Sequence, residues 1–375
     1  MKKIIILLWL CLLGVPAVRA ANAANADWTP AKSWVFVVGL LEWKHPDFLH
    51  SFPKDGRRDT LLTEYFKDRG VSADHILLMQ DRAATTKAVR DAMKTFVAKA
   101  EKDDTLFLYF CGHGFTGDDG VVYFATYDAY DKGWAVSSIF DTLDADFHGK
   151  NAVLLADCCE SGVMAELAKT HKGPTDYAVL TSVANRETST GNWTFSDSLL
   201  DVLEGRPQVD LDGDGVITFD EASRYIRSEM RFFDEQTSAA SRGGKLPAEF
   251  KLAVAQPKSD KRIGEHVEVL YEGEWWRAII ESVKDGKVHV RYASAAAREE
   301  GWVADKDVRA FNADAKPAGP GLIVGAKAQV EWHHRWWPAH VLKVNADEKK
   351  YFITYDGYGK DWDEWVGADR IRVKP

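Results

Sequence analysis

Two residues that could carry out nucleophilic chemistry each follow an apolar segment of the sequence. His113 lies two residues after the segment 106–111, between Gly112 and Gly114, and Cys159 lies three residues after the segment 152–156. A thiol attacks a carbonyl as its thiolate, and a neighbouring imidazole is the common means of removing the thiol proton near neutral pH. The pair therefore predicts cysteine-based acyl transfer if the fold brings the two side chains together.

The alternative is a purely structural role, because a single buried cysteine or histidine is usually only a core residue. That interpretation suits Cys111 and Cys158 taken one at a time. His113 and Cys159 differ, because both follow the ends of apolar segments and do not lie within them. A domain that keeps both residues without activity remains the alternative.

The apolar runs LFLYF and AVLLA predict strands that are buried on both faces of a parallel sheet. In such sheets ligands bind beyond the carboxyl ends of the strands, where His113 and Cys159 are expected. Strands alternate with helices along the chain, which predicts right-handed crossovers and a mostly parallel sheet. The other expected elements are strands at 33–41, 75–79 and 177–182, helices at 58–69, 85–100 and 136–143, and a hairpin at 115–126.

At these motifs the chain resembles the caspase-like cysteine peptidases, which include caspases, metacaspases and legumains. LFLYFCGHG matches their apolar strand followed by His-Gly, and AVLLADCCESG matches their apolar strand followed by an acid, any residue, Cys, any residue and Ser-Gly. The resemblance covers residues 32–255 and implies an α/β caspase-like domain, a mostly parallel sheet flanked by helices. It implies that Cys159, and not Cys158, is the nucleophile.

The same resemblance implies a mechanism with a His113–Cys159 dyad. His113 takes the thiol proton and later gives it to the leaving amine, while Cys159 attacks the scissile carbonyl. The backbone N–H groups of Gly114 and Cys159 are the expected oxyanion donors, since glycine permits close approach. No third acid is assigned.

Asp157 lies two residues before the expected nucleophile, where metacaspases and legumains place an acid of the primary specificity pocket. The resemblance therefore implies a preference for a basic residue before the cleaved bond, the P1 residue. The alternative is that Lys54, Arg57 or Arg58 supplies a pocket cation and reverses the preference toward Asp or Asn.

The segment 210–221 has oxygen-bearing residues at the positions of a calcium-binding EF-hand loop, with Gly215 at the sharp turn. The alternative is a structural turn before a helix that begins near Phe219, because EF-hands usually occur in pairs and this loop is single. The expected calcium ligands are Asp210, Asp212, Asp214, the carbonyl of Val216, Thr218 and Glu221.

The N-terminus and the overall charge bear on location and partners. Residues 1–23 have a basic start, an apolar stretch and small residues at the end, which predicts a cleaved signal peptide and export to the periplasm or medium. A membrane anchor is the competing interpretation, but the stretch is short, so no stable membrane span is expected after cleavage.

The net charge of −9 argues against nucleic-acid binding. The mature chain has three cysteines, too few to hold a domain of this size together by disulfides. The sequence still allows a Cys111–Cys158 bridge or oxidation of Cys159.

From about residue 258 the chain becomes rich in tryptophan and repeats itself at an offset of about 61 residues, as from Gly264 to Gly325. The two copies, 263–311 and 322–374, predict small all-β barrels. They resemble SH3-like Tudor-knot or agenet domains, in which an aromatic cage captures a methylated lysine or arginine. The cage candidates are Trp332, Tyr355, Tyr358 and Trp362, although such barrels also need large aromatics for their cores.

Together these observations predict an exported caspase-like cysteine endopeptidase that acts on a peptide or protein substrate and binds calcium. Its barrels are expected to bind a peptide or a cell-wall ligand. The alternative from another class is a catalytically inactive, calcium-binding scaffold on the same fold.

Overall fold

A computed structural model describes residues 26–184, 189, 191–234, 236–271, 274–292, 301–311, 327–332, 335–345, 350–355 and 362–373. The chain divides into two compact units, Met1–Met230 with Gln236–Pro257 and Arg231–Glu235 with Lys258–Pro375. The expected signal peptide lies outside the described residues. Among the described helices, none is both long and apolar enough to cross a membrane.

The first unit is built on a six-stranded sheet with the strand order β10-β8-β7-β3-β1-β2. Five strands run parallel, and only β10 at the edge is antiparallel to its neighbour. The three central strands β1, β3 and β7 are buried along their whole length, as their apolar sequences predict. The strands are β1 (Ser33–Gly39), β2 (Ile76–Gln80), β3 (Thr105–Cys111), β7 (Asn151–Asp157), β8 (Asp176–Thr181) and β10 (Ala239–Gly243).

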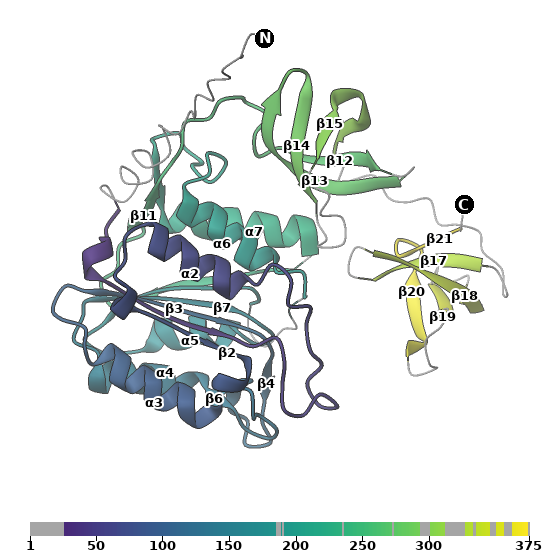
Figure 1. Cartoon of the computed structure of the whole chain (residues 1–375). Helices are drawn as coiled ribbons and strands as arrows, with labels where there is room; N and C mark the ends of the chain where they lie inside the picture. The colour runs from purple at the N-terminus through teal and green to yellow at the C-terminus, as the bar shows by residue number, and fades with distance from the viewer. Residues whose placement is uncertain are drawn as a thin grey trace, which may run out of the picture. The chain divides into compact units, whose positions relative to one another are not determined.

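Helices cover both faces of this sheet, with α2, α6 and α7 on one face and α3, α4 and α5 on the other (Figure 1). Because successive side chains of a strand point to opposite faces, β3 sends Leu108 into one core and Tyr109 into the other. The helices are α2 (Arg58–Asp68), α3 (Thr86–Val97), α4 (Val136–Asp146), α5 (Gly162–Thr170), α6 (Thr194–Glu204) and α7 (Phe219–Asp234). The mostly parallel, helix-flanked sheet predicted from the sequence is confirmed.

Two small sheets complete the first unit. The predicted hairpin is present as β4 (Gly114–Thr116) and β5 (Val122–Phe124), extended by β6 (Trp134–Ala135). A two-stranded sheet joins β9 (Val216–Thr218) to β11 (Lys251–Val254). Strand β4 begins directly after His113, and β9 lies within the predicted calcium loop.

The second unit contains two five-stranded antiparallel sheets, with orders β15-β14-β13-β12-β16 and β20-β19-β18-β17-β21. The long strand of each sheet shifts register at one point, after Ile280 in β13 and after Val341 in β18. Such a bulge bends a strand, which small barrels need in order to curl. The strands are β12 (His266–Tyr271), β13 (Glu274–Lys284), β14 (Lys287–Tyr292), β15 (Trp302–Ala304), β16 (Val308–Ala310), β17 (Lys327–Trp332), β18 (Arg335–Asn345), β19 (Lys350–Tyr355), β20 (Glu364–Gly367) and β21 (Ile371–Val373).

The two copies therefore share strand order and bulge position, and each is a curled SH3-like sheet as the internal repeat predicts. Valines such as Val269 in the first copy and Val330 in the second are fully buried in the small cores. The last turn of α7, which belongs to this unit, adds Phe232 and Phe233 to a cluster with Ile279 of β13.

Candidate active site at the carboxyl ends of the strands

The register of the central strands brings the two predicted catalytic segments together. Cys111 at the end of β3 lies opposite Asp157 at the end of β7, so His113 and Cys159 each follow two residues beyond the same level of the sheet. The main chains also touch, because a Cβ added at Gly114 would lie 2.0 Å from the carbonyl oxygen of Cys159. Glycine at position 114 is therefore required by the close approach of the backbone that carries Cys159.

Cys159 is the most accessible of the three described cysteines. Its side chain is partly exposed, whereas Cys111 and Cys158 are buried. The backbone N–H of Ser189 lies 3.3 Å from the Cys159 sulfur. Burial raises the pKa of the Cys159 thiol and raises the pKa values of Cys111 and Cys158 well above the ordinary thiol value. The side chain of Cys159 is thus a neutral thiol at pH 7, and it would need a base to become a thiolate.

The imidazole of His113 is held in a box of aromatic rings. Its centroid lies 4.5 Å from that of Trp43, 4.5 Å from His50 and 4.7 Å from Phe52. Burial lowers the pKa of His113 to about 4, so the ring is neutral at pH 7. Its Nε2 lies 2.9 Å from the backbone carbonyl of His50. Since a carbonyl only accepts hydrogen bonds, Nε2 carries the proton and Nδ1 has a free lone pair.

The loop that carries Cys159 is tied to the strand that follows His113. Glu160 has a positive φ of 58°, uncommon for a residue with a side chain, and its carboxylate accepts a hydrogen bond from Thr116 of β4. Helix α5 begins at Gly162, three residues after Cys159. The partial positive charge at a helix start favours negative charge nearby, which suits a thiolate or an oxyanion at this position.

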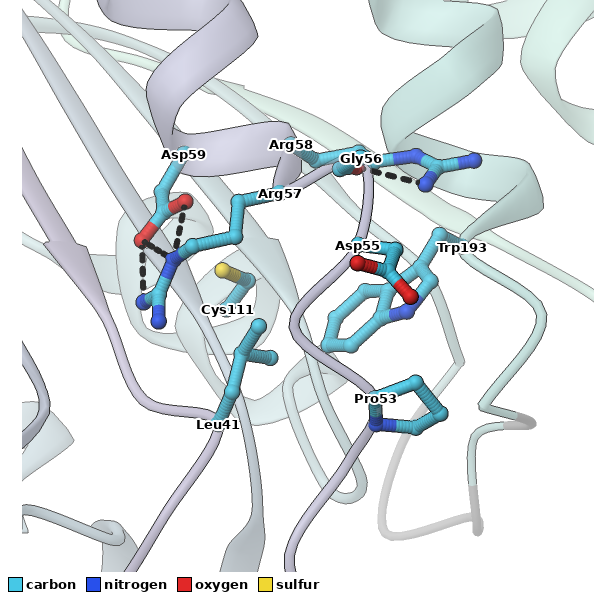
Figure 2. A pocket seen from close by; sticks show the side chains of 9 residues that line it. All are labelled: Leu41, Pro53, Asp55, Gly56, Arg57, Arg58, Asp59, Cys111 and Trp193. Atoms are coloured by element: carbon cyan, nitrogen blue, oxygen red, sulfur yellow. Dashed lines mark hydrogen bonds and ion pairs between the residues drawn. The ribbon is translucent and has the colours of Figure 1, made fainter.

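A pocket opens beside the end of β3, on the face of the sheet covered by α2 and α6 (Figure 2). Figure 2 shows Asp55 and Trp193 on one side of the view and the Arg57–Asp59 pair on the other, with Cys111 and Leu41 between them. Trp193 also has a positive φ, of 62°. The lining residues are Leu41, Pro53, Asp55, Gly56, Arg57, Arg58, Asp59, Cys111 and Trp193.

Each cation in and around this pocket already has carboxylate partners. Arg57 bonds Asp59 and Asp81, each at 2.7 Å. The other ion pairs join Arg58 to Asp197 at 2.8 Å and Lys54 to Glu42 at 2.7 Å and Asp81 at 3.0 Å. Within the described part of the chain, Asp55 is the charged lining residue with no ion pair or hydrogen bond of its side chain. The charges of the lining residues Asp55, Arg57, Arg58 and Asp59 sum to zero, and the Asp55 carboxylate is the one that remains for a ligand.

Asp157 lies beside this pocket and not in its lining. Its side chain is 3% exposed, and its Oδ2 accepts hydrogen bonds from the N–H of Ser196 at 3.2 Å and the hydroxyl of Ser196 at 2.6 Å. Ser196 in turn lies 2.6 Å from the Tyr109 hydroxyl. The carboxylate thus fixes the first turn of α6 and sits behind Cys111, its neighbour in the sheet.

Three of the expected calcium ligands lie close together in the 210–221 loop. Asp210, Asp212 and Asp214 each offer an oxygen within 4.8 Å of the others. Glu221 is buried and is not in this group, since its carboxylate accepts hydrogen bonds from the Leu211 N–H at 2.9 Å and from Thr218. The partner strand that EF-hands usually take from a second loop is here β11. The single loop therefore has a structural partner within its own unit.

The cage candidates of the second barrel are only partly placed. Trp332 and Trp362 are 40% and 52% exposed, and their rings lie 5.7 Å apart at 81° to each other. Tyr355 is 8% exposed and donates a hydrogen bond to Glu364 at 2.8 Å, which makes it a core residue. Tyr358 lies outside the described residues. The two rings Trp332 and Trp362 are thus exposed and nearly perpendicular to each other.

Sequence comparison defines the class of protein to which this fold and site belong. The caspase domain family matches residues 59–252, more than half of the chain, and the chain belongs to that family. The agenet domain matches residues 264–312. Residues 322–373 match the Tudor-knot family, described as the RNA binding activity-knot of a chromodomain. The sheet, the two motifs and the two barrels are thus those of a caspase-domain protein with C-terminal Tudor-like modules.

Individual relatives match less of the chain. Protein MRG1 of Arabidopsis thaliana is 41% identical over 61 residues, which are 15% of this chain and 19% of MRG1. The chain thus spans about a fifth of the length of that relative. A crystal structure of protein GSU0716 from Geobacter sulfurreducens is 15% identical, with a TM-score of 0.42, and the match covers 60% of this chain and 100% of that one.

The sequence reasoning missed the aromatic box of Trp43, His50 and Phe52 and the pocket residue Asp55. These residues lie in one segment, 43–55, that holds no helix or strand. Its density of aromatic and histidine residues just after the first apolar strand is the signal that could have found it.

Proposed function

We propose that the first unit is a cysteine endopeptidase that uses His113 and Cys159. The observation that carries the proposal is the register of β3 and β7, which sets the two residues at one level, with Gly114, the neighbour of His113, against the Cys159 carbonyl. The neutral imidazole, with Nδ1 unprotonated, supports the role of His113 as the base.

In this mechanism Nδ1 of His113 accepts the thiol proton as the Cys159 sulfur bonds to the scissile carbonyl carbon. The carbonyl π electrons move to oxygen, where the N–H groups of Gly114 and Cys159 donate hydrogen bonds. The C–N bond then breaks, and the imidazolium gives its proton to the departing amine. A water that His113 deprotonates hydrolyses the thioester and restores the thiol.

The pocket supports a basic P1 residue. The cations that could reverse the preference, Lys54, Arg57 and Arg58, are each neutralised by carboxylates. Asp55 is left to pair with an incoming lysine or arginine, and Asp157 adds negative potential from behind Cys111. Both acids therefore favour a cation, Asp55 by contact and Asp157 through the pocket wall.

We expect lysyl and arginyl peptides to be cleaved at least about tenfold better than aspartyl or asparaginyl ones, as a pocket built for a charged group requires. Asp55→Asn should lower kcat/KM for a lysyl peptide about tenfold, since one charge-assisted hydrogen bond contributes about 1.5 kcal/mol. Asp118→Asn, an exposed acid in the β4–β5 turn, is the matched control. Faster cleavage of aspartyl or asparaginyl peptides would instead indicate Lys54, Arg57 or Arg58 as the specificity residue.

We also propose that the 210–221 loop binds calcium. Three aspartate oxygens already converge there, and their mutual repulsion disfavours the loop without a cation. The Val216 carbonyl, Thr218 and Glu221 would complete the ligand set, with Glu221 turning from its backbone hydrogen bonds. Pairing of β9 with β11 lets one loop serve without a second.

Calcium at a hundredfold excess over its Kd should stabilise the folded protein by about 2.7 kcal/mol, which raises the Tm by about 5 to 10 °C in a domain of this size. The double variant Asp212→Asn/Asp214→Asn keeps the shapes of these exposed side chains and should lose the rise. Differential scanning calorimetry in calcium and in chelator measures both. Superimposable melting curves of the unaltered protein would mean a purely structural turn.

For the C-terminal barrels we propose binding of a peptide, or of a cell-wall ligand, through a cationic group. The crossed rings of Trp332 and Trp362 support this, because aromatic faces attract cations. Export by the predicted signal peptide is part of the same proposal, and it favours an extracellular or periplasmic ligand.

A further inference from the structure

Two exposed aromatic side chains gather beside the strand that follows His113. Phe48 and Tyr130 are 49% and 61% exposed, and their rings lie 5.3 Å apart. The ring centroid of Phe48 also lies 6.0 Å from that of Phe115, a partly buried residue of β4, and the centroid of Tyr130 lies 5.5 Å from that of His45. Single exposed aromatics are ordinary on a protein surface, but an adjoining group beside a candidate active site is a candidate binding surface.

The loop that presents Phe48 is firmly anchored on both sides. Trp43 is 4% exposed and donates a hydrogen bond from Nε1 to the Ala125 carbonyl at 3.0 Å. Leu49 is 7% exposed, and the Phe52 N–H closes the loop on the Leu41 carbonyl at 2.9 Å. Phe48 is therefore held outward by a loop that is anchored by its buried residues Trp43 and Leu49.

The proposed reaction indicates which part of the substrate would meet this aromatic cluster. His113 protonates the leaving amine, so the substrate residues after the cleaved bond lie on the His113 side of the site. Phe115 is two residues beyond His113, in β4, which is the outer strand of its sheet and can pair with an extended peptide. The P1 pocket lies on the opposite face of the sheet, beside Cys111 and Trp193.

We infer that Phe48, Tyr130 and Phe115 form a subsite for a large apolar or aromatic side chain of the substrate, at the first or second residue after the cleaved bond. The inference rests on the proposed peptidase activity. Substrate rings packed edge-to-face on Phe48 and Tyr130 add aromatic contact to the burial of apolar area. The protein thus selects on both sides of the bond, for a cation before it and a ring after it.

Three internally quenched peptides test the subsite. They share a lysine before the cleaved bond and carry Ala-Ala, Phe-Ala or Ala-Phe after it. The unaltered protein should cleave one of the phenylalanine peptides with a kcat/KM about tenfold above that of the Ala-Ala peptide. The double variant Phe48→Ala/Tyr130→Ala should lose this ratio. The control Leu61→Ala, which removes an apolar side chain of α2 that is 46% exposed, should keep it. Equal cleavage of all three peptides, or a preference that survives in the double variant, overturns the inference.

A binding measurement separates this inference from the peptidase proposal. Fluorescence anisotropy gives the Kd of labelled forms of the same peptides for Cys159→Ala, with and without the Phe48→Ala/Tyr130→Ala changes. Tighter binding of a phenylalanine peptide that depends on Phe48 and Tyr130, without turnover by the unaltered protein, keeps the subsite and contradicts the peptidase. Turnover without any such difference in Kd or kcat/KM keeps the peptidase and contradicts the subsite.

Discussion

Replacing Cys159 by alanine is expected to lower the rate of lysyl peptide cleavage by about four orders of magnitude or more. Loss of the nucleophile has an effect of this size in enzymes whose catalytic residues act together. His113→Ala should have an effect of the same order, because the thiol pKa is raised by burial and the reaction needs the base. A fluorogenic lysyl peptide assay measures both variants.

The adjacent cysteine supplies the control for this prediction. Cys158 is 2% exposed and packs in the core on the α3–α5 face, so Cys158→Ala should keep most of the activity and lose only about 1 kcal/mol of stability. Turnover at the unaltered rate in Cys159→Ala would show that another group performs the reaction.

Gly114→Ala is expected to lower kcat/KM about a hundredfold or more without unfolding the protein. The new Cβ would stand 2.0 Å from the Cys159 carbonyl oxygen, so the loop that carries Cys159 must move away from β4. A displacement of about 1 Å in a catalytic group costs about a hundredfold in rate. The assay should be paired with a circular dichroism melt that shows the folded state is retained.

Gly191→Ala is the matched control for this change, because its Cβ would meet Phe52 at an ordinary distance of 3.4 Å. Its activity should stay near that of the unaltered protein. Full activity in Gly114→Ala would mean that the contact between β4 and the Cys159 loop does not position the Cys159 thiol for the proposed reaction.

Much of the fold could be predicted from the sequence because its signals are local. The apolar runs predict β3 and β7, the turn at Gly120 predicts the β4–β5 hairpin, and the internal repeat predicts the two barrels. These local signals do not determine the order of the central strands in the sheet. The edge strand β10, and the pairing of β9 with β11, have no local signal and were not predicted.

The candidate site could be predicted only in part, because several of its contacts join distant segments. The motifs locate His113 and Cys159, but nothing near His113 in sequence announces that Trp43 and Phe52 surround its ring. Neutralisation of Arg58 depends on Asp197, 139 residues away. Pairing of this kind decides whether an arginine near the pocket is available to a ligand, so the sequence left the P1 preference open.

Labelling with a lysyl chloromethyl ketone tests the central claim most directly and separates the peptidase from an inactive scaffold. The reagent carries the proposed P1 residue and alkylates a thiol that the site activates. Mass spectrometry of the digested protein should show one adduct, on Cys159, and no adduct in the Cys159→Ala or His113→Ala variants. An unmodified Cys159, or an adduct that forms equally well in His113→Ala, would contradict the account.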